Sequence, residues 1–115
     1  MLRHTMARVR VARQLSSAAR GYVLLRYSYV PDMLERRQPH RAAHLEHWKR
    51  DIDSGALRLA GAYGPVDGAL FVFRGKTRAY VEERARTDPY CLAELVPSTS
   101  TVDWTVVVGA DLGTP

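Results

Sequence analysis

The most constraining feature of this sequence is the order in which strand-like and helix-like segments alternate between residues 21 and 109. The run 22–30 is rich in Tyr, Val and Leu and is bounded by Gly21 and Pro31, which predicts a buried central strand. Residues 39–54 predict a helix, because proline is accepted in a first turn and Gly55 suits a left-handed cap. The segments that follow are predicted as strands 56–63 and 68–74, a helix opened by Thr77, a short helix opened by Asp88 and Pro89, and a strand 101–109.

This β-α-β-β-α-β order is that of a ferredoxin-like α+β fold, with an antiparallel sheet covered by helices on one face. The strands carry apolar residues on both sides, and no further helix remains in the chain to cover the second face. A homodimer that packs sheet against sheet, as a dimeric α/β barrel, would bury that face. The predicted partner is therefore a second copy of the chain.

Positive charge is concentrated at the start of the chain. The formal net charge is +5, and residues 1–20 hold five arginines and no Asp or Glu; the rest of the chain has 12 basic and 12 acidic side chains. This profile is typical of an organelle transit peptide, with the mitochondrial matrix as the expected destination and a plastid or the cytoplasm as alternatives; a disordered basic arm is the other interpretation. The folded domain is then residues 21–110, with 111–115 as a tail.

Composition excludes several classes of function. A nearly neutral domain without a basic patch does not suit a nucleic-acid binder, and no apolar run reaches the roughly 20 residues that cross a bilayer, so neither nucleic acid nor a stable membrane association is expected. Cys91 is the only cysteine, which excludes an internal disulfide. No glycine-rich phosphate loop or cofactor-attachment motif is present, and no cofactor is predicted.

The predicted helix 39–54 holds three of the four histidines. At 3.6 residues per turn, one stripe carries Leu45, Trp48 and Ile52, which we expect to pack against the core. The adjacent stripe carries His40, His44, His47 and Asp51, and is expected to face a cleft, with His47 on the solvated side. Just before this helix, Asp32 and Glu35 have the spacing of a capping box, which predicts a short helical turn.

Several short segments, taken in order and with their spacing, resemble those of the YCII-related domain family from about Tyr22 to Gly109. They are Arg41-Ala42-Ala43-His44-Leu45, Leu59-Ala60-Gly61-Ala62, Pro65-Val66-Asp67-Gly68, Asp88-Pro89-Tyr90 and Trp104-Thr105-Val106-Val107-Val108-Gly109. The resemblance implies a small dimeric α/β-barrel domain in which His44 and Asp88 form an active-site pair. The chain departs from the family pattern at Arg84, where an apolar or aromatic side chain is expected.

A His–Asp pair suits acid/base chemistry, because a carboxylate on one imidazole nitrogen fixes the tautomer and raises the basicity of the other. His40 and Arg41 could hold an anionic group one turn before His44, and Tyr63 and Tyr90 could line the pocket. No nucleophile accompanies the pair. The predicted function is therefore elimination, isomerisation or hydrolysis of a small anionic organic molecule.

Two other interpretations remain open from the sequence. Asp88 can be a helix cap and His44 a buried structural side chain, in a dimer that binds a small ligand without turnover. His40 and His44 can also form a two-histidine metal clamp that Asp51 or a residue of a partner chain completes, although no metal is included in the prediction.

Overall fold

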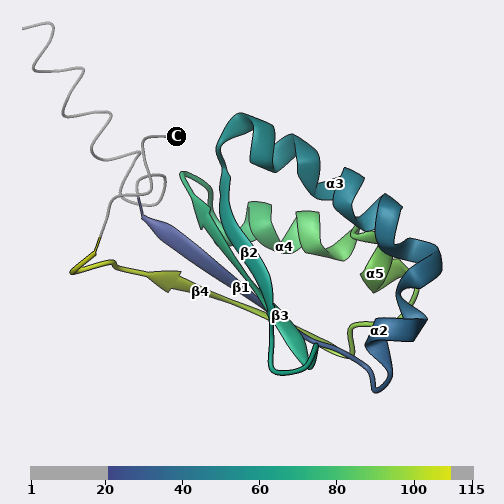
Figure 1. Ribbon diagram of the computed structural model, residues 1–115. Coiled ribbons are helices and arrows are strands. Elements are labelled where there is room, and N and C mark those ends of the chain that lie inside the picture. Colours follow the sequence, from purple (N-terminus) through teal and green to yellow (C-terminus); the bar gives the residue numbers. More distant parts are fainter. Residues whose placement is uncertain (1–20, 110–115) are drawn as a thin grey trace, which may run out of the picture.

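The computed structural model describes residues 21–109, and Figure 1 shows their arrangement. The elements are β1 (Tyr22–Ser28), α2 (Met33–Arg36), the 3₁₀ helix η1 (Gln38–His40), α3 (Arg41–Ser54), β2 (Leu57–Tyr63), β3 (Gly68–Arg74), α4 (Arg78–Arg86), α5 (Pro89–Leu92) and β4 (Ser98–Trp104). The predicted transit peptide or basic arm and the tail 111–115 lie outside the described residues. No helix in residues 21–109 is long and apolar enough to cross a membrane.

The four strands form one antiparallel sheet in the order β2-β3-β1-β4, so β1 is central. Helices α3 and α4 lie side by side over one face of the sheet, and α2 and α5 lie near one end of it (Figure 1). The predicted ferredoxin-like α+β architecture is confirmed. The residue pattern explains it, because alternate β1 side chains Val23, Leu25 and Tyr27 are buried under the helices.

Helix boundaries follow local chemistry in most places. Gly55 ends α3 with a φ of 85°, and the Thr77 side chain caps α4 by accepting from the Tyr80 backbone N–H. The predicted capping box at Asp32 is wrong, because Asp32 has a left-handed backbone (φ 59°) and its side chain caps nothing. The helix predicted from Pro39 begins instead as η1 and becomes α-helical at Arg41.

The last strand was predicted too late in the chain. β4 begins at Ser98 and ends at Trp104, where its partner strand ends, since Trp104 pairs with Tyr22 and Ser98 pairs with Ser28. Trp104 is the partner of Tyr22, the first residue of β1, and residues 105–109 form no strand. The length of an edge strand is therefore set by its neighbour rather than by its own β-propensity.

Helix α3 packs through a different stripe from the one predicted. Leu45 and Ile52 are 51% and 56% exposed, whereas Trp48 is 3% exposed and His44 and Asp51 are also buried. The buried face is thus His44, Trp48 and Asp51, spaced four and three residues apart. A polar stripe can take the core-facing position here because each of its polar groups has a partner.

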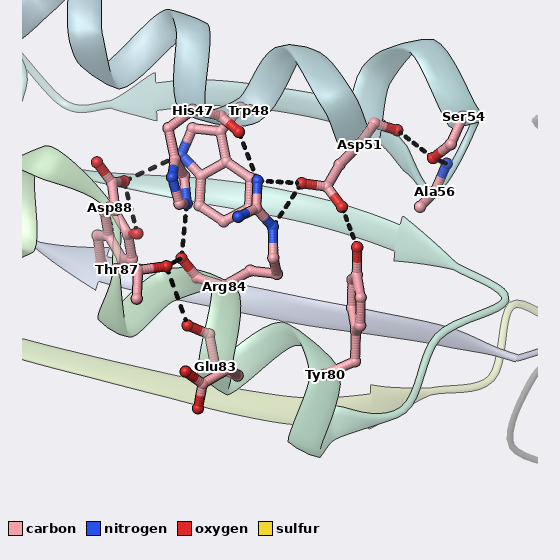
Figure 2. Close-up of polar contacts among 11 residues, drawn as sticks. His47, Trp48, Asp51, Ser54, Ala56, Tyr80, Glu83, Arg84, Thr87 and Asp88 are labelled. Atoms are coloured by element: carbon pink, nitrogen blue, oxygen red, sulfur yellow. Dashed lines mark hydrogen bonds and ion pairs between the residues drawn. The ribbon is translucent and has the colours of Figure 1, made fainter.

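Arg84 supplies one of these partners, which explains its departure from the family pattern. Its guanidinium reaches from α4 to α3, where Nε donates to the fully buried Asp51 carboxylate at 2.9 Å, and it lies over the Trp48 ring (Figure 2). The Tyr80 hydroxyl donates to the other Asp51 oxygen. His47 also bonds to the Arg84 carbonyl oxygen at 2.7 Å, so it is half-buried rather than solvated as predicted.

The sheet face turned away from the helices carries apolar side chains. The members that are more than two-fifths exposed are Leu59, Leu70, Val102 and Trp104, from three strands. Exposed apolar area of this kind on one face is typical of an interaction surface.

Candidate acid–base site

Asp88 is a fully buried carboxylate that receives hydrogen bonds from four groups. Oδ1 accepts from the Tyr90 backbone N–H at 2.9 Å and from His44 Nδ1 at 2.8 Å. Oδ2 accepts from the Tyr27 hydroxyl at 2.8 Å and from Trp48 Nε1 at 2.9 Å, and Figure 2 shows the indole pointing at it. Asp88 is therefore both the cap of α5 and the acceptor for three side chains.

These donors decide the charge of Asp88. Burial by itself raises the pKa of a carboxyl, but the contacts with His44, with the Tyr90 N–H and with the Tyr27 hydroxyl together outweigh it and hold the pKa of Asp88 below its usual range. Burial, reinforced by the Asp88 charge, raises the pKa of Tyr27 far above its usual range. The Tyr27 hydroxyl therefore stays protonated and donates a hydrogen bond, and Asp88 is ionised at neutral pH.

The Asp88 contact also fixes the orientation of His44. The imidazole stacks face to face on the Tyr90 ring, with centroids 3.7 Å apart and an interplanar angle of 2°. Because an ionised carboxylate only accepts, Nδ1 must carry the proton in the 2.8 Å bond. No residue of the described part of the chain hydrogen-bonds to Nε2. The neutral imidazole therefore keeps its lone pair on Nε2, the atom that can take a proton from another molecule.

Three elements, α3, β1 and α5, bring these groups together. Helix α3 carries His44 and Trp48 one turn apart on its buried face, and β1 carries Tyr27 on its helix-facing side. Asp88 lies at the start of α5, where Pro89 in the first turn and the cap hold its side chain. The carboxylate is therefore placed by backbone geometry, and the histidine is placed by packing against it.

Two adjoining cavities meet at His44. One, which we call the cationic cavity, has a volume of about 150 Å³ and is lined by Arg37, Arg41 and Tyr29 together with small residues of β2. The other, which we call the apolar cavity, has a volume of about 290 Å³ and lies between α3 and β2; its apolar lining includes Leu45, Ile52, Leu57, Leu59 and Phe71. His44, Leu45, Ala60 and Phe71 line both.

The cationic cavity is suited to an anion. Its lining contains two arginines and no acidic side chain. Arg41 Nη1 donates to the Tyr90 hydroxyl at 3.1 Å, while the buried Arg37 Nε has no hydrogen-bond partner within residues 21–109. Burial raises the pKa of Tyr29 above its usual range, so its hydroxyl stays neutral. Guanidinium groups bind carboxylates and phosphates through paired hydrogen bonds.

The predicted site residues are partly brought together. His44 and Asp88 are in contact, Arg41 lines the cationic cavity, and Tyr90 stacks on His44. His40 lies in η1 and lines neither cavity.

Tyr63 was also predicted to line the pocket, but the structure places it elsewhere. It pairs with Gly68 on the sheet face opposite the helices, and its hydroxyl donates to the Tyr27 carbonyl oxygen at 2.9 Å. Its position follows from the register of β2, in which Leu59, Gly61 and Tyr63 share the outer face.

Three residues of the site were not predicted from the sequence. Trp48 is four residues after His44 and so lies on the same helix face, and Tyr27 alternates with Leu25 on the buried side of β1; these spacings were available signals. No sequence pattern distinguishes Arg37 from the neighbouring Arg36.

The histidine-based metal hypothesis receives no support from the geometry. Within the described range, no three His, Cys, Asp or Glu side chains gather in a metal-binding arrangement. His44 Nδ1 is bonded to Asp88, and Asp51, the suggested third ligand, is paired with Arg84 and Tyr80 of α4.

Comparisons with known proteins agree with this architecture. A family model for the YCII-related domain matches residues 21–105. The comparison with curated proteins gave no match. Among solved structures, the chain is similar to 5-chloro-2-hydroxyhydroquinone dehydrochlorinase (TftG) from Burkholderia phenoliruptrix AC1100 in complex with 2,5-dihydroxybenzoquinone. The TM-score is 0.63 and the identity 19%, over 73% of this chain and 93% of that one, which shows a shared fold.

Proposed function

We propose that this chain, which belongs to the YCII-related domain family, is an enzyme that transfers a proton on a small anionic organic molecule. His44 would be the general base and acid, and Asp88 the residue that orients it. The observation that carries this proposal is the saturation of Asp88 by four donors, which holds the proton on His44 Nδ1 and leaves Nε2 free.

The proposed chemistry begins with the substrate anion on Arg37 and Arg41. Nε2 of His44 then removes a proton from a carbon or hydroxyl of the substrate, and the Asp88 carboxylate stabilises the imidazolium that forms. The same proton is returned to another substrate atom in an isomerisation. In an elimination, the electron pair of the broken bond expels a leaving group.

Covalent catalysis does not suit the two cavities. Their lining contains no Ser, Thr, Cys or Lys side chain. Cys91 lines neither of them, and burial raises the pKa of its thiol to about 11, which keeps it in the unreactive protonated form at neutral pH. Proton transfer, or hydrolysis with a water activated by His44, is therefore favoured over acyl transfer.

The similar structure supports elimination within this group of reactions. Its name describes a dehydrochlorinase, which removes a proton and a chloride from a hydroxylated ring, and its ligand is a small acidic quinone. A molecule of that size and charge is compatible with cavities lined by arginines on one side and by apolar side chains on the other.

We also propose that two copies pack through the apolar outer sheet face. Leu70, Val102 and Trp104 would be buried there, together with the outer side of β1. Sedimentation of the full chain should give twice the 12.9 kDa mass, and Val102→Glu should shift it towards one chain. A single-chain mass for the unaltered protein would contradict the proposed dimer.

The function can be tested without knowing the natural substrate, by following exchange of carbon-bound hydrogen with D₂O by NMR. Suitable probes are 2,5-dihydroxybenzoquinone, a chlorinated hydroxyhydroquinone and a set of 2-oxo acids. The full chain is expected to accelerate exchange of at least one probe, and His44→Asn to reduce this acceleration by about 10²–10⁴-fold, the usual contribution of a positioned acid or base.

The matched control is Lys49→Gln, an exposed change on the same helix, which should exchange the probe at the unaltered rate. Equal rates in the unaltered chain and in His44→Asn would rule out His44 as the base. Saturable binding of the probes with no exchange would favour the alternative function, a dimer that binds a small ligand without turnover.

A further inference from the structure

We infer that the substrate is an amphipathic anion, in which an acidic group binds Arg37 and Arg41 and an apolar body occupies the apolar cavity. This inference rests on the proposed function and names the class of molecule on which it would act. It is carried by the two cavities, which differ in chemistry and meet at the same histidine.

The cationic cavity has room for an acidic group and at most a small ring or a few carbon atoms. Its volume of about 150 Å³ corresponds to roughly five water molecules at the liquid volume of ~30 Å³ each. The guanidinium groups of Arg37 and Arg41 supply its positive charge, and the segment of β2 that lines it, Ala60, Gly61 and Ala62, consists of small residues that leave space for the anion. The rest of the molecule must extend beyond it.

The apolar cavity is the continuation of that space. Most of its lining is apolar. Of its polar groups, Trp48 Nε1 is bonded to Asp88, one Arg58 nitrogen donates to the Gly55 carbonyl oxygen at 2.9 Å, and His44 lies at the junction with the cationic cavity. Its volume of about 290 Å³ corresponds to roughly ten water molecules. Because most of this lining is apolar, a hydrocarbon chain or ring is the occupant that loses least free energy on leaving water.

Exposed side chains around this cavity point to the same conclusion. Leu45 and Ile52 of α3 both line it and are both more than half exposed. Covering them with the apolar part of a ligand gains about 25 cal/mol per Å² of area removed from water. The exposure of Leu45 and Ile52, which a packed helix stripe would not show, is thereby explained by ligand binding.

The position of His44 then locates the reacting atom. Because His44 lines both cavities, its imidazole lies at the junction between the acidic group and the apolar body. The proton that it moves should therefore be on an atom one or two bonds from the acidic group. Such a position is chemically favourable, because the acidic carbon of a carbonyl or carboxyl compound lies next to that group.

The test uses the full chain and a homologous series of probes: acetate, butyrate, hexanoate and octanoate, with hexanamide as the uncharged match of hexanoate. Isothermal titration should show affinity rising roughly threefold to fourfold for each added methylene between butyrate and octanoate, the value for a CH₂ group moved out of water. Hexanamide should bind at least tenfold more weakly than hexanoate, because it brings no charge to Arg37 and Arg41.

Two variants separate the two cavities. Arg37→Gln should remove most of the preference for hexanoate over hexanamide and keep the dependence on chain length. Ile52→Asn should flatten the dependence on chain length and keep the affinity for acetate; its side chain is exposed, so the fold should tolerate the change. Leu92→Asn, an equally conservative change at an exposed leucine outside both cavities, should alter neither property.

Affinity independent of chain length, or equal affinity for hexanoate and hexanamide, would overturn the inference. This result would leave the proposed function standing if His44-dependent exchange is observed with other probes. Conversely, the expected binding series without exchange in any probe would reject catalysis and keep the amphipathic anion as the ligand of a binding protein.

Discussion

Replacing Arg84 by methionine is expected to lower the free energy of unfolding by about 3–5 kcal/mol, the usual cost of removing one member of a buried ion pair. Asp51 is fully buried, and without Arg84 its charge would keep only the Tyr80 hydroxyl as a side-chain partner. The loss should be measured by urea unfolding of the full chain followed by far-UV circular dichroism. Both side chains link α3 to α4, so the variant should also unfold less cooperatively.

The control for this prediction is Arg86→Met on the same helix. Arg86 pairs with Glu83 in an exposed position, where an ion pair contributes little, so this variant should unfold close to the unaltered chain. The double variant Asp51→Leu with Arg84→Met should recover most of the lost stability, since it removes both charges. A cost below about 1 kcal/mol for Arg84→Met alone would show that the pair does not hold the helices together.

Replacing Asp88 by asparagine is expected to lower the rate of proton transfer by about 10³–10⁴-fold while the fold is retained. The asparagine amide has the same shape, but its NH₂ group can donate to His44 Nδ1, which favours the tautomer with the proton on Nε2. The base would then have no lone pair directed at the substrate. The deuterium-exchange assay described above measures this loss.

Folding and catalysis can be separated in that variant. The carbonyl oxygen of asparagine can still accept from Tyr27 and Trp48, so the variant should still unfold in one thermal transition although its exchange rate falls by orders of magnitude. Exchange at the unaltered rate in Asp88→Asn would show that Asp88 acts only as the cap of α5.

The fold could be predicted from the sequence because local signals decide most of it. Gly55, Thr77 and the Asp88–Pro89 step end or begin helices by chemistry that acts within a few residues. Boundaries that depend on a distant strand were not predictable in this way. The run 105–109 has a strong strand composition, yet β4 ends at Trp104, the partner of Tyr22 at the start of β1.

The site was predictable only in part, for a related reason. The cap at Asp88 is a local signal, and the family pattern implied its pairing with His44. The convergence of Tyr27, Trp48 and Arg37 on the site is set by three elements packing together, which spacing along the chain does not specify. The buried face of α3 combines Trp48, which was predicted to pack, with His44 and Asp51 of the adjacent stripe, because an Asp51 matched by Arg84 can be buried in place of leucine.

The central claim is that Asp88 holds the proton on Nδ1 of His44 and leaves Nε2 as the base. The most direct measurement is the ¹⁵N chemical shift of both ring nitrogens of His44 in the full chain, labelled at histidine and recorded where the ring is neutral, beside the Asp88→Asn variant. We predict a protonated Nδ1 and a bare Nε2 in the unaltered chain, and the opposite tautomer in the variant. A proton on Nε2 in the unaltered chain, or the same tautomer in both proteins, would contradict the account.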